Sequence, residues 1–276
     1  MGHLYALDFD GVLCDTCAET VISALKAAKL RWPALFDSVD SATEDWIVQQ
    51  MITVRPVVEH GYDTLLLVRL LLETRVPSIK KSSVAEGLTA EGILENWLKL
   101  KPILMEEWNE NKDDLIDLFG KVRDDWLEQD FPGWIESNRF YPGVADALRF
   151  ASSRVYIVTL KQSRFADALL RELAGITIPP ERMYALGSGR KIEVLKKLQK
   201  MPEHQGMTLQ LRFMCIHSFV EDRFATLKNV IKEPELDKWS LYLVDWGYNT
   251  QKEKDEAAAN PRIQLLELND FSSKLK

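Results

Sequence analysis

The stretch YALDFDGVLCD, residues 5–15, ends a short apolar run with two carboxylates, Asp8 and Asp10, and follows them with Gly11. In a β-strand, residues i and i+2 point to the same side, so we expect the two carboxylates to converge while Phe9 packs the other way. Strands of an open α/β sheet end at the edge where ligands bind. Two carboxylates that meet there repel each other, so one must be protonated or a cation must lie between them. The glycine allows a sharp turn or lets backbone amides face an anion.

The hydrophobic pattern divides the rest of the chain into a helical region and an alternating one. Residues 16–140 have helical periodicity, with a buried helix expected at 61–73, whereas strands and helices alternate from residue 141 onward. Such alternation is typical of a doubly wound, mainly parallel Rossmann-like sheet with helices on both faces. The N-terminal strand has nothing to pair with alone, so it must join that sheet. We therefore expect an α/β core from residues 1–15 and 141–276, with an all-helical cap at 16–140 inserted after the first strand.

Five further strands are expected in the C-terminal half. They are RVYIVT (154–159), RMYAL (182–186), LRFMCIHSF (211–219), SLYLVD (240–245) and IQLLEL (263–268). Short apolar runs of this kind are typical of strands that are buried on both faces of a sheet.

The composition favours an ordinary globular protein. The chain has 276 residues, 46% of them hydrophobic and 28% charged, and a net charge of −7. An acidic surface argues against a nucleic-acid backbone or an anionic membrane as the main partner, although a local pocket can still bind a small anion. No apolar run approaches the length of a membrane span and the N-terminus lacks a secretory pattern, so we expect an intracellular, cytoplasmic protein. The oligomeric state does not follow from the sequence.

Three cysteines, an odd number, argue against a disulfide framework in a chain of this length. Cys14 and Cys17 form a C-x-x-C pair, which leaves a redox function as one alternative. A second such pair, as a four-cysteine zinc site would need, does not occur. Cys215 is expected to be a small core residue.

Four short motifs in the chain resemble those of the haloacid dehalogenase-like hydrolases. DFDGVLCD resembles the first motif of this family, and VYIVTLK supplies Thr159 as the hydroxyl residue of the second. Lys191 in GSGRKIEVL matches the lysine of the third motif, and Glu221 and Asp222 in HSFVEDRF match the acidic pair of the fourth. The four motifs occur in the order that the family has. The inserted helical region is similar to that of the phosphoglycolate phosphatase-like branch.

This resemblance implies a phosphatase that works through an aspartyl-phosphate intermediate. Asp8 would be the nucleophile, and Asp10 would protonate the leaving oxygen and then take a proton from the attacking water. The family uses Mg²⁺, for which the expected ligands are Asp8, the Asp10 main-chain carbonyl, Asp222, and Glu221 either directly or through water. The Thr159 hydroxyl and the Lys191 ammonium would hold the phosphoryl oxygens.

The chain departs from the family pattern at three positions. Leu160 stands where relatives often have Asn, and Lys161, which comes next, would add a phosphate contact. Ile192 stands where many relatives have Pro, and Thr226 where a further Asp often follows the fourth motif. None of these departures removes a primary role.

Two arginines of the expected cap are candidates for binding a second anionic group of the substrate. Arg69 interrupts an otherwise apolar run, and Arg55 precedes a helix break at Pro56. A guanidinium suits a carboxylate or a phosphate because it presents a fork of donors. The alternative for Arg69 is a local ion pair with Glu73 one helical turn later, or an extended conformation that reaches water.

The sequence thus favours a Mg²⁺-dependent phosphohydrolase of a small phosphorylated metabolite such as phosphoglycolate, a sugar phosphate or a nucleotide monophosphate. A phosphomutase would share Asp8, Asp10 and the cap, and would differ only in passing the phosphoryl group to a second substrate hydroxyl. A non-catalytic binding protein that keeps the fold is a further alternative. A dehalogenase is disfavoured, because it does not need the acid at Asp10.

Overall fold

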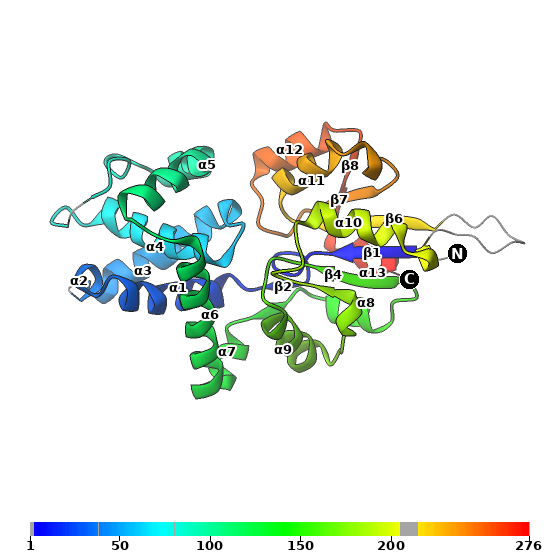
Figure 1. Cartoon of the computed structure of the whole chain (residues 1–276), viewed down its shortest axis with the longest axis horizontal. Coiled ribbons are helices and arrows are strands. Elements are labelled where there is room, and N and C mark those ends of the chain that lie inside the picture. The colour runs from blue at the N-terminus through cyan, green and yellow to red at the C-terminus, as the bar shows by residue number, and fades with distance from the viewer. Residues whose placement is uncertain (1–2, 38, 80, 205–214, 276) are drawn as a thin grey trace, which may run out of the picture. The chain divides into compact units, whose positions relative to one another are not determined.

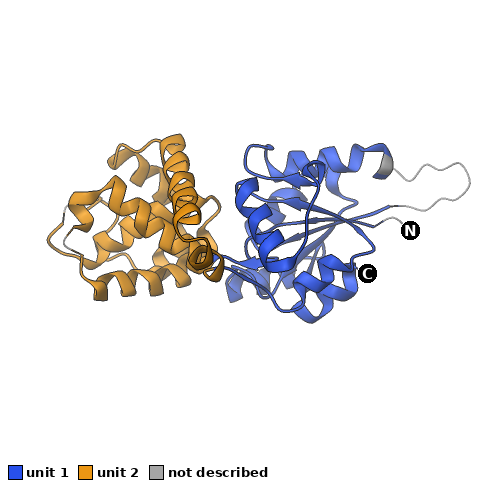
Figure 2. Cartoon of the chain, turned by 90° about the horizontal axis from the view of Figure 1, so that it is seen from below, with its two compact units in different colours: residues 1–16, 138–276 blue, residues 17–137 orange. Residues whose placement is uncertain are grey.

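The computed structural model divides the chain into two compact units (Figure 2). The core unit comprises Met1–Thr16 and Asn138–Lys276, and the helical unit comprises Cys17–Ser137. The second unit is therefore inserted into the first between two neighbouring strands of a small sheet, β2 (Cys14–Asp15) and β3 (Arg139–Phe140). The structure describes residues 3–37, 39–79, 81–204 and 215–275.

A six-stranded sheet forms the centre of the core unit (Figure 1), and every neighbouring pair in it is parallel. The strand order is β5-β4-β1-β6-β7-β8. Their bounds are β1 His3–Leu7, β4 Arg154–Val158, β5 Met183–Tyr184, β6 Ile216–Glu221, β7 Ser240–Val244 and β8 Ile263–Leu266. The doubly wound α/β fold expected from the alternating pattern is confirmed. The first part of the strand expected at 211–219, up to residue 214, lies outside the described residues.

The strand β1 is far in sequence from the other strands of the sheet, yet it lies near the centre of that sheet. It lies between β4 and β6, and the register pairs Leu7 with Ile157 on one side and with Val220 on the other. Because the three strands run parallel and in this register, the residues that follow them emerge at one edge of the sheet. Segments that are far apart in the sequence are brought together there.

Helices cover the sheet on both faces (Figure 1). On one face, α10, α11 and α12 pack with apolar strand residues such as Leu4, Phe219 and Leu241 in a single buried cluster. On the other face lie α8, α9 and α13. The six helices are α8 Val144–Arg149, α9 Ser163–Ala174, α10 Lys191–Lys200, α11 Phe224–Ile231, α12 Gln251–Ala258 and α13 Leu268–Leu275. Burial of both sheet faces explains why the strands read as nearly continuous apolar runs.

The helical unit is built around α4 (Gly61–Arg75), the helix expected from the apolar run at 61–73. Most of its residues are buried, and it packs against α1, α3 and α6. The other helices are α1 Cys17–Arg31, α2 Pro33–Phe36, α3 Ser41–Val54, α5 Ala90–Glu107, α6 Lys112–Gln129 and α7 Phe131–Glu136, with a 3-10 turn at Arg55–Val57. A buried ion pair joins α1 to α6, since Arg123 Nε lies 2.7 Å from Glu19 Oε1. None of the helices that the structure describes is long and apolar enough to span a membrane.

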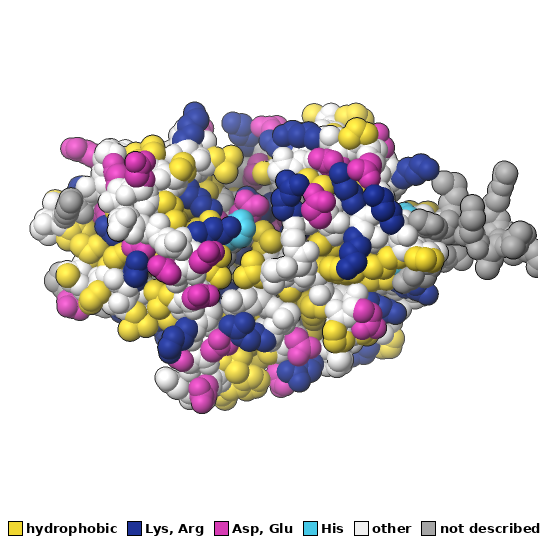
Figure 3. Space-filling view, viewed as in Figure 1, with side chains coloured by type: hydrophobic (Ala, Val, Ile, Leu, Met, Phe, Trp, Pro, Cys, Tyr) yellow, Lys and Arg dark blue, Asp and Glu magenta, His cyan; other side chains and the backbone are white. Residues whose placement is uncertain are grey.

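Acidic and basic side chains are interspersed over the face of the molecule seen in Figure 3. Exposed charges of this kind are hydrated and screened, so they carry little information about function. Buried charges are more informative, because their desolvation must be compensated by a partner or a ligand.

Candidate active site

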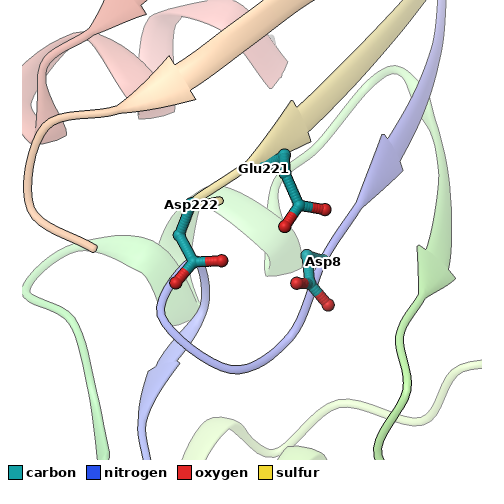
Figure 4. A group of neighbouring side chains, drawn as sticks. All are labelled: Asp8, Glu221 and Asp222. Atoms are coloured by element: carbon teal, nitrogen blue, oxygen red, sulfur yellow. The ribbon is translucent and has the colours of Figure 1, made fainter. Parts of the chain in front are cut away.

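Three carboxylates meet at the carboxyl edge of the sheet (Figure 4). Asp8 directly follows β1, Glu221 is the last residue of β6, and Asp222 follows it. The backbone ladder aligns them, since the Asp8 amide donates to the Val220 carbonyl at 3.0 Å. One oxygen from each carboxylate lies within 4.8 Å of the others, and all three side chains are buried. This is the only such acidic, histidine or cysteine group among the residues that the structure describes.

Lys191, the first residue of α10, lies between two of these carboxylates. Its Nζ atom is 2.6 Å from Asp8 Oδ2 and 2.7 Å from Glu221 Oε2. Backbone amides hold the other oxygens: Phe9 N donates to Asp8 Oδ1 at 2.7 Å, and Arg223 N donates to Glu221 Oε1 at 3.2 Å. Each oxygen of the two carboxylates therefore has a donor, and these donors fix the orientation of Asp8 and of Glu221.

The pKa values at the site indicate an excess of buried negative charge. Burial, together with the neighbouring Glu221 and Asp10, raises the pKa of Asp8 to about 7, although Lys191 opposes the shift. Burial and the neighbouring Asp222 also raise the pKa of Glu221, again against the effect of Lys191. For Lys191, burial favours the neutral amine, but its two carboxylate partners hold the pKa above its usual range. More positive charge than the lysine supplies would stabilise this arrangement.

Asp222 is held by two glycine-containing loops. Gly11 has φ +80°, and a Cβ atom built there would lie 2.2 Å from Asp222 Oδ2, so only glycine fits. A Cβ atom at Gly247, in the loop after β7, would lie 2.6 Å from the Gly11 carbonyl oxygen. The amide of Tyr248 donates to Asp222 Oδ2 at 3.1 Å. The Gly11 amide itself donates to the Cys14 carbonyl at 2.9 Å, which favours the sharp turn over an anion contact as the role of this glycine.

Asp10 lies in the loop after β1 and has cationic and hydroxyl partners of its own. The Thr16 hydroxyl donates to Asp10 Oδ1 at 2.6 Å, and Lys161 Nζ donates to the same oxygen at 3.1 Å. Lys161 is buried, so its ammonium serves this carboxylate as a close counter-ion. Thr159, also buried, directly follows β4, and its Oγ1 accepts from the Lys161 amide at 3.1 Å. Lys161, which the sequence predicts to contact the substrate phosphate, thus also contacts Asp10, and this second contact was not predicted.

Both arginine candidates belong to the helical unit. Arg69 Nε donates to Glu73 Oε1 at 3.0 Å, and its guanidinium lies 4.2 Å from the ring centre of Trp108. Arg69 therefore forms the local ion pair with Glu73 that the sequence analysis gives as the alternative to substrate binding. Arg55 is buried, and its Nη1 donates to the Val58 carbonyl at 3.4 Å.

Of the two cysteines in the C-x-x-C pair, Cys14 is buried and Cys17 is partly exposed. Both Cys14 and Cys17 are free thiols in the structure. Burial raises the pKa of Cys14 far above its usual range, which disfavours the thiolate that disulfide exchange requires.

Comparison with known proteins establishes the fold. No protein-family model matches the sequence, and no curated protein matches it. Among solved structures, a candidate haloacid dehalogenase-like hydrolase from Bacteroides fragilis has a TM-score of 0.54 at 12% identity, covering 98% of this chain and 100% of its own. A predicted phosphatase from Clostridium acetobutylicum has a TM-score of 0.53 at 15% identity, covering 99% and 98%.

A predicted phosphoglycolate phosphatase from Haemophilus somnus has a TM-score of 0.54 at 14% identity, covering 100% of this chain and 98% of its own. These likenesses extend over nearly the whole chain, including the inserted helical unit. The chain therefore has the fold of the haloacid dehalogenase-like hydrolases, as the motif resemblance implied.

Proposed function

We propose that this chain is a Mg²⁺-dependent phosphohydrolase that cleaves a small phosphorylated metabolite through an aspartyl-phosphate intermediate. The observation that carries the proposal is the buried meeting of Asp8, Glu221 and Asp222, of which Asp8 and Glu221 share the ammonium of Lys191. Two of the structures with the same fold are described as phosphatases, which agrees with this assignment.

The residues present fit a divalent cation. Mg²⁺ prefers hard oxygen ligands and takes few of them from protein, the rest being water and phosphate. Asp8 and Asp222 would bind it directly, the Asp10 carbonyl would be a further ligand, and Glu221 would bind directly or through water. The raised pKa values of Asp8 and Glu221 support such a site, because they reflect buried negative charge that a cation would offset. When bound, the ion supplies the positive charge that lets a phosphate dianion approach carboxylates.

The side chains divide the chemistry between them. The Asp8 carboxylate attacks phosphorus and forms an acyl phosphate, while Asp10 gives its proton to the departing alkoxide. Asp10, now ionised, takes a proton from water, and the resulting hydroxide attacks the acyl phosphate to release inorganic phosphate and restore Asp8. Lys191 and the Thr159 hydroxyl would bind the phosphoryl oxygens and hold them in line. The helical unit would act as the cap that encloses the substrate and selects its leaving group.

A metabolite panel tests the proposal. Purified protein is incubated with phosphorylated sugars, acids and nucleotides, with Mg²⁺ or with EDTA, and released phosphate is measured. We expect turnover of at least one ester with Mg²⁺, loss of that turnover in EDTA, and recovery when Mg²⁺ is added back. Transfer of the phosphoryl group to a second substrate hydroxyl, without phosphate release, would instead identify a phosphomutase. Metal-independent hydrolysis would contradict the site as assigned.

A further inference from the structure

Tyr248, in the loop after β7, joins three segments that build the candidate site. Its hydroxyl donates to Asp15 Oδ1 at 2.6 Å and accepts from the Thr16 amide at 2.8 Å. Its own amide donates to Asp222 Oδ2 at 3.1 Å. Its ring lies against Gly11, since a Cβ atom there would be 2.7 Å from Tyr248 Cδ2. None of these contacts was foreseen from the sequence.

The hydroxyl of Tyr248 fixes the residue that orients Asp10. The Thr16 amide bonds to Tyr248, and the Thr16 side chain donates to Asp10 Oδ1 at 2.6 Å, a short bond of the charge-assisted kind. Thr16 is completely buried, so its rotamer and its backbone position are coupled. Lys161 donates to the same Oδ1 atom. With two donors on Oδ1, the proton that Asp10 gives to a leaving group is carried on Oδ2.

Building on the proposed function, we propose that Tyr248 is a positioning residue for the acid–base step. Its hydroxyl holds the Thr16 backbone, and the Thr16 hydroxyl in turn aims Asp10 Oδ2 at the leaving oxygen. Asp8 and Lys191 depend on other partners: Asp8 on the Phe9 amide and Lys191 on Glu221. The Tyr248 hydroxyl therefore acts on the transfer of the proton and not on the nucleophile or the phosphate-binding groups.

A series of substituted phenyl phosphates separates these roles. Nitrophenolate leaves readily without a proton, whereas phenolate, a poorer leaving group, depends on protonation. Misplacement of the general acid should therefore make kcat/KM depend more steeply on the basicity of the leaving group. We would measure kcat/KM, which reports formation of the phosphoenzyme, for wild type, Tyr248→Phe, Thr16→Val and the double variant. The Phe variant keeps the ring and the amide that bonds to Asp222. Tyr242→Phe is the matched control, because Tyr242 is a buried tyrosine of β7 that the site does not use.

We expect Tyr248→Phe and Thr16→Val each to lose about tenfold more kcat/KM with phenyl phosphate than with p-nitrophenyl phosphate. Because both act through Asp10, the double variant should be no worse than Thr16→Val alone. The stabilisation by Mg²⁺ in thermal unfolding should stay unchanged in Tyr248→Phe. If that variant does not fold, Thr16→Val alone carries the comparison of leaving groups.

Three results would overturn the inference while leaving the proposed function intact. Equal losses with all leaving groups would mean a general structural effect, and additive losses in the double variant would separate Tyr248 from Thr16. A Tyr248→Phe protein that retains wild-type kcat/KM across the series would show that the hydroxyl does not position the acid. Wild-type protein that hydrolyses none of these esters, nor any of the metabolite panel, would overturn the proposed function itself, and with it this inference.

Discussion

Lys191 Nζ lies 2.6 Å from Asp8 Oδ2, and both side chains are about nine-tenths buried. The pair bridges α10 and the end of β1, and the same ammonium reaches Glu221 on β6. A buried ammonium between two carboxylates both neutralises charge and fixes geometry. The proposed nucleophile is thus held ready for attack before any substrate binds, as preorganised catalysis requires.

Replacement of the nucleophile should abolish activity and leave the fold intact. Asp8→Asn keeps the size of the side chain and the oxygen that accepts from the Phe9 amide, but it cannot form an acyl phosphate. We expect turnover of p-nitrophenyl phosphate to fall at least about 1000-fold. Asp245→Asn is the control, because Asp245 follows the neighbouring strand β7 and is not part of the acidic group. A variant that keeps more than a tenth of wild-type turnover would refute the role of Asp8, provided that its circular dichroism spectrum matches that of wild type.

Mg²⁺ should stabilise the protein through the acidic group even without substrate. A ligand that binds only the native state at about 100 times its Kd raises the free energy of unfolding by about 2.7 kcal/mol. Asp222→Asn should lose this stabilisation, because it removes one of the three carboxylates. Glu256→Gln, at an exposed acidic residue of α12, should keep it. Thermal unfolding with Mg²⁺ and with EDTA measures both. Equal shifts in the two variants would place the ion elsewhere.

The local hydrophobic pattern was sufficient to predict the strands of the sheet and the polar residues at their ends. Asp8, Thr159 and the Glu221–Asp222 pair each follow an apolar run, and parallel strands bring such positions to one edge. The ion-pair partner of Arg69 could also be predicted from the sequence, because Glu73 is one helical turn away.

Contacts between distant segments could not be predicted in this way. The contact of Lys161 with Asp10 depends on the pairing of β4 with β1, and that of Tyr248 with Thr16 depends on the loop after β7. Side-chain reach across a sheet edge is set by register and by loop conformation, and neither has a local pattern. One local feature did indicate a close backbone approach. It is Gly247 in WGYN, which comes directly after the strand expected at 240–245.

Arg69 should matter for stability more than for substrate binding. Its guanidinium pairs with Glu73, which is completely buried, and stacks on Trp108. Arg69→Met would leave that carboxylate without its cation, and we expect a loss of about 2 kcal/mol in the free energy of unfolding. KM for the best ester of the panel should stay within about threefold of wild type. A large rise in KM at unchanged stability would instead assign Arg69 to the substrate.

Acid should destabilise the protein partly through His217, on β6. Burial lowers the pKa of this histidine from its ordinary value, and its ring lies 5.1 Å from that of Trp239. The unfolded chain therefore takes up the proton first, so stability present near neutral pH is lost as the pH falls below about 6.5. The ring of His204, 6.4 Å away, is a second imidazole of this region. In urea unfolding at about pH 7 and about pH 5, His217→Phe should lose less stability than wild type. An identical loss in both proteins would mean that His217 does not titrate differently in the folded state.

The contact between Gly11 and Asp222 gives a test in which one glycine serves as the control for another. Gly11→Ala combines two penalties, because φ is +80° and the new methyl would lie 2.2 Å from Asp222 Oδ2. Gly187 has φ +96°, but a Cβ atom there meets nothing within 4 Å, so Gly187→Ala carries the backbone penalty alone. That penalty is about 1 kcal/mol in each protein.

Any further loss in Gly11→Ala measures displacement of the Asp222 carboxylate or of the loop itself. We therefore expect Gly11→Ala to be at least about 1 kcal/mol less stable than Gly187→Ala in EDTA. It should also lose most of the stabilisation by Mg²⁺, because the displaced carboxylate no longer shares the ion with Asp8. Calorimetry with and without Mg²⁺ measures both quantities. If the two alanine variants were equally stable and responded equally to Mg²⁺, the close approach of Gly11 to Asp222 would have no part in building the site.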